Sequence, residues 1–147
     1  LQPKSRGVIQ LKSSDPLEAP LIQPNYLTDE EDWVNLVNGY KIGRKLLNAK
    51  AFSPYSKGEM LPGKMVETDE QIRTDIQKRA ESIYHPVGTC KMGIDDMAVV
   101  NPKLQVQGVS GLRVIDASIM PTLVAGNTNA PTMMIAEKAA SMILAER

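Results

Sequence analysis

The sequence is poor in the residues that most often carry covalent or metal chemistry. Its 147 residues include one cysteine, Cys90, and one histidine, His85. A single cysteine excludes an internal disulfide, and so few thiol and imidazole ligands leave no zinc-type spacing. The sequence also lacks a phosphate-binding glycine loop and a serine elbow. We therefore expect no metal site and neither P-loop nor serine-hydrolase chemistry.

The sequence also has no excess of positive or negative charge. The 17 lysines and arginines balance the 17 aspartates and glutamates, so the formal net charge is zero. This balance gives no reason to expect nucleic acid or an anionic membrane as a partner. No apolar run is long enough to cross a bilayer, and the start does not resemble a signal segment. We expect no membrane span, a cytoplasmic location by default and, because the first residue is Leu1, a sequence cut from a longer protein.

The N-terminal half has the composition of a soluble globular protein and shows clear element boundaries. Alternating residues around Val8 predict a short strand, whereas the three prolines between Ser13 and Asn25 predict an irregular segment. A capping box at Thr28 predicts a helix over 29–49, with an apolar stripe on the core. A second capping box at Thr68 predicts a helix that ends near Tyr84, because Pro86 disfavours helical backbone at the residue before it.

The C-terminal half is dominated by loops and short apolar runs. Residues 99–100, 104–106 and 111–116 predict short strands, the last of them buried and ending in Asp116. Pro131 suits the first position of a closing amphipathic helix. Helices, short strands and long loops together predict an α+β domain, whose final strand, loop and helix belong to a neighbouring layer.

His85 is the first candidate for chemistry. An imidazole exchanges its proton close to physiological pH and can accept one from an alcohol hydroxyl. It can equally satisfy backbone groups at the end of a helix, and position alone favours that structural role. Cys90, five residues away, invites a cysteine-hydrolase hypothesis, but no third orienting residue is evident.

Asparagines and an aspartate mark two further candidate positions. Asn127 and Asn129 precede the closing helix, where short polar residues often act as caps. The same helix end presents free N–H groups and partial positive charge, which favour an anionic group or a reduced flavin ring. Asp116 follows an apolar run, where a carboxylate can bind a ligand hydroxyl or simply form a turn.

Three motifs taken together resemble a known family. Residues 84–93 read YHPVGTCKMG, residues 108–121 read GVSGLRVIDASIMP, and residues 126–132 read GNTNAPT. Their order and spacing resemble the C-terminal signature of the glucose–methanol–choline (GMC) oxidoreductases, and within that family the choline dehydrogenase and alcohol dehydrogenase branch. The resemblance is most specific from His85 onward.

The resemblance implies an FAD-dependent enzyme that transfers hydride from a small-molecule alcohol to flavin. It assigns catalytic roles to His85 as the base and to Asn127 as the second catalytic residue. Asp116 and Ala117 would hold FAD near its ribityl–pyrophosphate part. Thr128 and Asn129 would lie along the flavin ring.

The resemblance also implies a division of the chain. Residues 1–110 would form a substrate-binding domain, an antiparallel sheet flanked by helices, and 111–147 the last strand and helix of an FAD-binding domain. The N-terminal FAD-binding half would be missing. We therefore expect an isolated chain that is inactive, binds FAD weakly and can self-associate. The alternative is a non-catalytic binding or assembly module in which His85 is structural.

Overall fold

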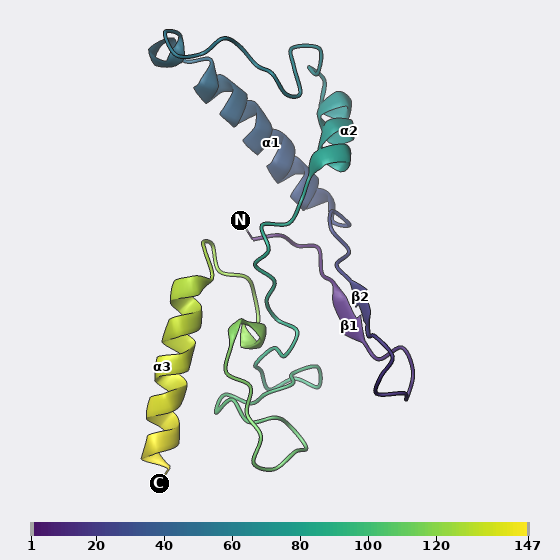
Figure 1. Cartoon of the computed structure of the whole chain (residues 1–147), viewed down its shortest axis with the longest axis vertical. Coiled ribbons are helices and arrows are strands. Elements are labelled where there is room, and N and C mark those ends of the chain that lie inside the picture. The colour runs from purple at the N-terminus through teal and green to yellow at the C-terminus, as the bar shows by residue number, and fades with distance from the viewer. Residues whose placement is uncertain (1, 147) are drawn as a thin grey trace. The chain divides into compact units, whose positions relative to one another are not determined.

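The computed structural model describes residues 2–146, which form two compact units. One, which we call the helical unit, comprises Lys4–Gly7 and Pro24–Ser82. The other, the C-terminal unit, comprises residues 2–3, 8–23 and 83–146. In chain order the elements are β1 (Val8–Gln10), β2 (Leu21–Gln23), α1 (Glu30–Leu47), the 3-10 helix η1 (Lys50–Phe52), α2 (Asp69–Arg79), the 3-10 helix η2 (Ala117–Ile119) and α3 (Asn129–Ala145) (Figure 1). Within residues 2–146, no helix combines the length and the apolar character needed to cross a membrane.

Helix α1 of the helical unit begins one residue later than the Thr28 capping box predicted. Asp29 is the N-cap, and its Oδ1 accepts a hydrogen bond from the Glu31 amide at 2.8 Å. The Thr28 hydroxyl instead donates to the Asn25 carbonyl oxygen at 3.0 Å. The predicted Thr28 box is therefore wrong, because the neighbouring carboxylate satisfies the free amides of the first turn equally well.

A buried carboxylate ties the first residues of the unit to α1. Asp32, 6% exposed, accepts hydrogen bonds from the Lys4 amide (2.7 Å), the Ser5 amide (2.9 Å) and the Ser5 hydroxyl (2.5 Å). Ser5 Oγ in turn accepts from the amides of Thr28 (3.0 Å) and Asp29 (3.1 Å). A buried charge is tolerated only when it is paired or hydrogen-bonded, and here three donors meet that condition.

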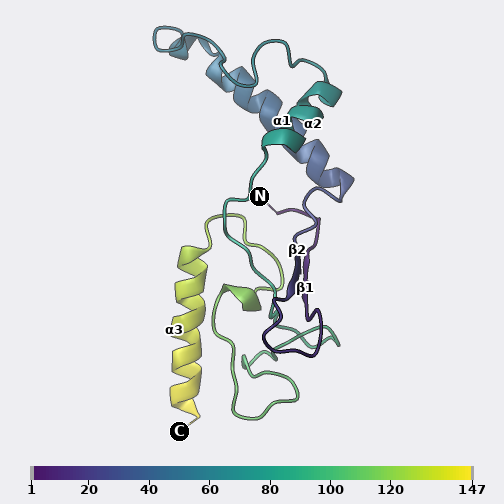
Figure 2. The same ribbon diagram turned by 45° about the vertical axis from the view of Figure 1, so that its right-hand side comes forward.

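Helix α2 begins as predicted and ends earlier. The Thr68 hydroxyl accepts from the Gln71 amide at 3.2 Å, and the Gln71 side chain accepts from the Thr68 amide at 3.0 Å, so this capping box is confirmed. The helix ends at Arg79 and not near Tyr84, because proline restricts only the residue before it and sets a latest possible end. Helices α1 and α2 contact each other, and they lie close together in both views (Figures 1 and 2).

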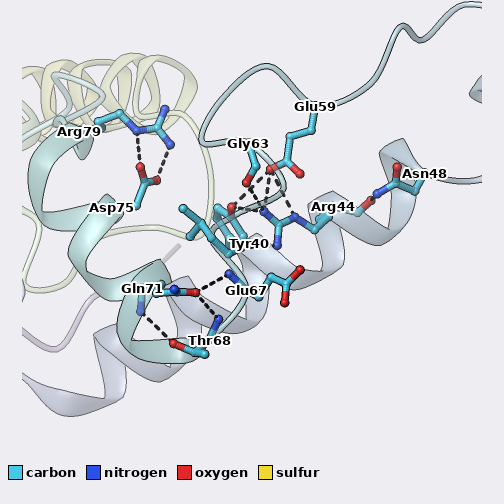
Figure 3. Close-up of polar contacts among 11 residues, drawn as sticks. Tyr40, Arg44, Asn48, Glu59, Gly63, Glu67, Thr68, Gln71, Asp75 and Arg79 are labelled. Atoms are coloured by element: carbon cyan, nitrogen blue, oxygen red, sulfur yellow. Dashed lines mark hydrogen bonds and ion pairs between the residues drawn. The ribbon is translucent and has the colours of Figure 1, made fainter.

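The long connection between α1 and α2 is held by one arginine (Figure 3). The Arg44 guanidinium donates to Glu59 Oε1 at 2.8 Å, to the Val66 carbonyl oxygen at 2.7 Å and to the Tyr40 hydroxyl at 2.7 Å. It also lies 4.8 Å from the centre of the Tyr40 ring. The hydrogen bond to Glu59 raises the pKa of Arg44 above its ordinary value. One fork-shaped donor thus fixes residues 59–66 against α1.

The C-terminal unit contains the only regular strands of the described residues, in a two-stranded antiparallel hairpin. The predicted strand at Val8 is confirmed, and Ile9 pairs with Ile22 at its centre. Strand β2 was missed, because the prolines of residues 13–25 predicted an irregular segment. Pro20 and Pro24 flank β2 without interrupting it, so no ladder hydrogen bond is lost.

A small apolar core organises the rest of the unit. Val100, Leu104, Ile119 and Ala139 are buried together, so η2 and α3 pack on the same cluster as the 99–106 loops. The strands predicted at 99–100, 104–106 and 111–116 are wrong as regular elements, since only isolated bridges form there. A strand requires a continuous partner, and each of these bridges ends after one residue pair. The predicted domain boundary between residues 110 and 111 stays a prediction.

Helix α3 is apolar on more than one side. It begins at Asn129, so Pro131 is its third residue and not its first as predicted. Proline is tolerated there because the first four amides of a helix have no partner within it. Ala139 is buried, but Met133, Met134 and Leu144 are more than half exposed. The predicted single core-facing stripe therefore describes only part of the helix.

Candidate active site

His85 lies in the turn that follows α2, and its tautomer can be assigned. The ring is half-buried, and its Nδ1 is hydrogen-bonded to the carbonyl oxygen of Ile83. A carbonyl oxygen only accepts, so Nδ1 carries the hydrogen of the neutral ring. Nε2 then bears the lone pair and is the nitrogen able to accept a proton. This is the form that a general base acting on a hydroxyl requires.

The loop that follows His85 is fixed to η2 by backbone hydrogen bonds. The Cys90 amide donates to the Ser118 carbonyl oxygen at 3.0 Å, and the Met92 amide donates to the Ile119 carbonyl oxygen at 2.8 Å. Gly88 makes the close approach possible: its φ is +86°, and a Cβ there would lie 3.2 Å from the Met120 carbonyl oxygen. The YHPVGTC segment and the turn after Asp116 are therefore parts of one layer.

Asp116 and Ala117 form the start of η2. Asp116 Oδ1 accepts a hydrogen bond from the Ser118 amide at 2.7 Å, so the carboxylate caps this short turn. The structural role that the sequence suggested for Asp116 is thus present. The carboxylate is exposed, and among residues 2–146 no donor reaches its second oxygen, which leaves that oxygen able to accept from a ligand.

The N-terminus of α3 lacks the caps that the other long helices have. Its N-cap residue, Thr128, is 8% exposed and makes no side-chain capping hydrogen bond, and the first turn contains no acidic residue. By contrast, α1 and α2 both have a side-chain cap and acidic residues in the first turn. The amides of Asn129 and Ala130 belong to the group of helix-start donors without an intrahelical acceptor. Asn127 and Asn129 are exposed beside them.

All six predicted site residues lie in the C-terminal unit. Asp116, Ala117, Thr128 and Asn129 belong to segments that pack on one apolar core, and the His85 loop is bonded to the same turn. No hydrogen bond joins His85 to Asn127 within the described residues. The Cys90 thiol likewise makes no hydrogen bond to His85 in this part of the chain, which removes support from the cysteine-hydrolase hypothesis.

Two other features of the described residues offer less chemistry. An open hollow of about 610 Å³ is lined by Asn101 and residues 105–113 and contains none of the six predicted residues. Its one charged group, Arg113, is paired with Glu146. Within residues 2–146, no group of three or more His, Cys, Asp or Glu side chains could hold a metal ion.

Comparison with known proteins decides the family. Residues 3–136 match the family model described as GMC oxidoreductase. The chain belongs to this family. It is 57% identical over 144 residues to the alcohol dehydrogenase [acceptor] of Pseudomonas putida, covering 98% of this chain and 26% of that protein. It is 48% identical over 139 residues to an oxygen-dependent choline dehydrogenase of Pseudomonas fluorescens, covering 95% of this chain and 24% of that protein.

A solved structure agrees with the sequence comparison. An FAD-dependent oxidoreductase from Chaetomium thermophilum superposes with a TM-score of 0.92 at 33% identity, covering 99% of this chain and 26% of that structure. The GMC resemblance, its choline and alcohol dehydrogenase branch and the α+β class are thereby confirmed. The chain spans about a quarter of the length of the curated relatives it matches. Membership in this family implies FAD as the cofactor of the full-length protein.

Proposed function

We propose that this GMC chain supplies the acid–base residues of an FAD-dependent enzyme that oxidises a primary or secondary alcohol. The observation that carries the proposal is the hydrogen bond between His85 Nδ1 and the Ile83 carbonyl oxygen, from which we assign Nε2 as the proton acceptor. FAD, when bound, supplies the hydride acceptor for the alcohol carbon. His85 Nε2 accepts the hydroxyl proton, and the Asn127 amide donates a hydrogen bond to the alcohol oxygen.

The α3 N-terminus supports the assignment of a flavin beside this helix end. Negative charge that develops on a ligand is stabilised by free helix amides and by the positive end of the helix dipole. Thr128 and Asn129 would lie along the ring, and Asp116 and Ala117 would hold the ribityl–pyrophosphate part. The missing side-chain cap and the missing acidic residue in the first turn support this assignment, because both would compete with an anionic ligand.

Kinetics of the FAD-loaded, full-length protein test the catalytic roles. His85→Gln is expected to lower kcat/KM for alcohols by about 10²–10⁴-fold, the usual contribution of a general base. Asn127→Ala should lower it by a smaller factor, since one hydrogen bond to the reacting oxygen is lost. Asn35→Ala, an exposed asparagine on α1, serves as the matched control and should leave kcat/KM unchanged. An unchanged kcat/KM in His85→Gln would overturn the proposal.

The 147 residues by themselves are proposed to be inactive and to associate. Their accessible surface is 11471 Å², whereas a compact monomer of 16.1 kDa exposes roughly 7,400 Å² and two separate compact bodies of the units' sizes roughly 9,000 Å². Exposed apolar side chains on α3 contribute to this excess. We expect purified chain to lack flavin absorbance and to sediment as oligomers. A monomer with bound FAD and alcohol turnover would contradict both expectations.

A further inference from the structure

Tyr84, directly before His85, has a backbone conformation that is costly for its side chain. Its φ is +59°, in the left-handed region that residues other than glycine and asparagine rarely adopt. The side chain is 79% exposed, so burial of the ring offers little compensation. Strain of this kind persists where the surrounding structure requires it, and it gathers at functional sites.

The φ angle of Tyr84 sets the direction of the Ile83 carbonyl group. That torsion turns the peptide that contains the Ile83 oxygen about the Tyr84 N–Cα bond. A change from +59° to an ordinary helical value near −60° would swing the carbonyl by about 120°. The His85 ring is only two residues away, so such a swing would remove its Nδ1 from the Ile83 oxygen.

The next residue restricts the ring from the other side. Pro86 disfavours helical backbone at His85, so a change in the His85 backbone is not a ready way to recover the contact. The geometry points to Tyr84 as a positioning residue: its left-handed backbone holds the Ile83 carbonyl against His85 Nδ1 and thereby makes Nε2 the proton acceptor. The catalytic meaning of this role rests on the proposed function, whereas the tautomer itself does not.

The single histidine makes the tautomer directly measurable. In the 147-residue chain labelled with ¹⁵N at histidine, two-bond ¹H–¹⁵N spectra at alkaline pH report His85 alone. We expect the Nδ1–H form to predominate, the opposite of a solvated histidine. Tyr84→Gly and Tyr84→Asn should keep this form, because both residues tolerate positive φ. Tyr84→Val should lower the ratio of Nδ1–H to Nε2–H by about fivefold or more.

Tyr55→Val, at an exposed tyrosine without positive φ, is the matched control and should leave the ratio unchanged. Circular dichroism monitors the folding of each variant. If Tyr84→Val loses helix, the inference is judged from the tautomer ratio of Tyr84→Gly and Tyr84→Asn. An Nε2–H form in the unmodified chain, its appearance in those two variants, or an unchanged ratio in a folded Tyr84→Val variant would overturn the inference. These results are independent of the His85→Gln kinetics, so failure of the positioning role and failure of the proposed function are distinguishable.

Discussion

Removal of the Asp32 carboxylate is expected to release the first residues of the helical unit from α1. The carboxylate is 6% exposed and accepts three hydrogen bonds, two from the amides of Lys4 and Ser5 and one from the Ser5 hydroxyl. Asp32→Ala leaves these donors without their acceptor. Asp32→Asn preserves the volume but places an NH₂ group against at least one donor, so it cannot satisfy all three.

The magnitude follows from the charge and the burial of the acceptor. A hydrogen bond to a charged group contributes about 1.5–3 kcal/mol, and bonds that share one acceptor do not add fully. Because water can reach part of the exposed segment of residues 4–6, we expect a loss below the sum of three such bonds. Asp32→Ala should therefore reduce the free energy of unfolding by about 3 kcal/mol.

Urea unfolding followed by circular dichroism measures this loss. Asp15→Ala is the matched control. Asp15 Oδ1 also accepts a backbone hydrogen bond, from the Leu17 amide, but Asp15 is exposed, and we expect a loss of about 0.5 kcal/mol. The double-mutant cycle of Ser5→Ala with Asp32→Ala should give a coupling of about 0.5–3 kcal/mol. Equal losses for Asp32→Ala and Asp15→Ala would refute the reasoning.

Acid provides a second test of the same contact. Burial raises the pKa of Asp32, but hydrogen bonds from the Ser5 hydroxyl and from the Lys4 and Ser5 amides outweigh it, and the net shift is downward. A depressed folded pKa contributes stability that is fully present above the ordinary value, about 3.9, and is lost as pH falls through the folded pKa. The stability difference between the unmodified chain and Asp32→Asn should therefore narrow below pH ~4.

Two further substitutions test the loop contacts. Gly88→Ala should destabilise by about 1–2 kcal/mol, because φ is +86° and the new Cβ would meet the Met120 carbonyl oxygen at 3.2 Å; Gly39→Ala, in open space on α1, should instead stabilise by about 0.5–1 kcal/mol, and thermal unfolding of both checks the contrast. Arg44→Lys loses the guanidinium group that donates to the Val66 carbonyl oxygen, and it should increase amide hydrogen exchange at residues 59–66. Arg79→Lys, on the exposed face of α2, is the control and should cause no such increase. Equal exchange in the two lysine variants would contradict the role of Arg44.

Local signals in the sequence were reliable where the structure depends on neighbours along the chain. The Thr68 capping box was confirmed because Thr68 and Gln71 lie within a few positions of each other. The Thr28 capping box was predicted wrongly although it is equally local, because Asp29, one residue later, accepts the hydrogen bond of the first turn. The α2 end was misplaced because a proline limits a helix without specifying where the chain leaves it.

Pairing across long sequence distances was not predictable from pattern alone. Strand β2 depends on β1, whose paired residues lie 11 to 15 positions earlier, and the pattern of the proline-rich residues 13–25 gives no sign of this pairing. The same limit applies to the site. His85, Asn127 and Asp116 were selected through the family resemblance, but the contact of His85 with the Ile83 carbonyl oxygen and the left-handed turn at Tyr84 have no sequence signature.

The apolar run at residues 111–116 explains why pattern and structure disagree in the C-terminal unit. Val114 and Ile115 pack against the buried cluster, so the pattern correctly reported burial. It reported a strand as well, yet in residues 2–146 the only bridge of this segment joins Arg113 to Gln105. Burial follows from composition, whereas a ladder needs a partner strand that these residues do not offer. The exposed apolar side chains of α3 add a second argument. We propose that the C-terminal unit completes its packing against another surface, which the FAD-binding half or a second copy of the chain would supply.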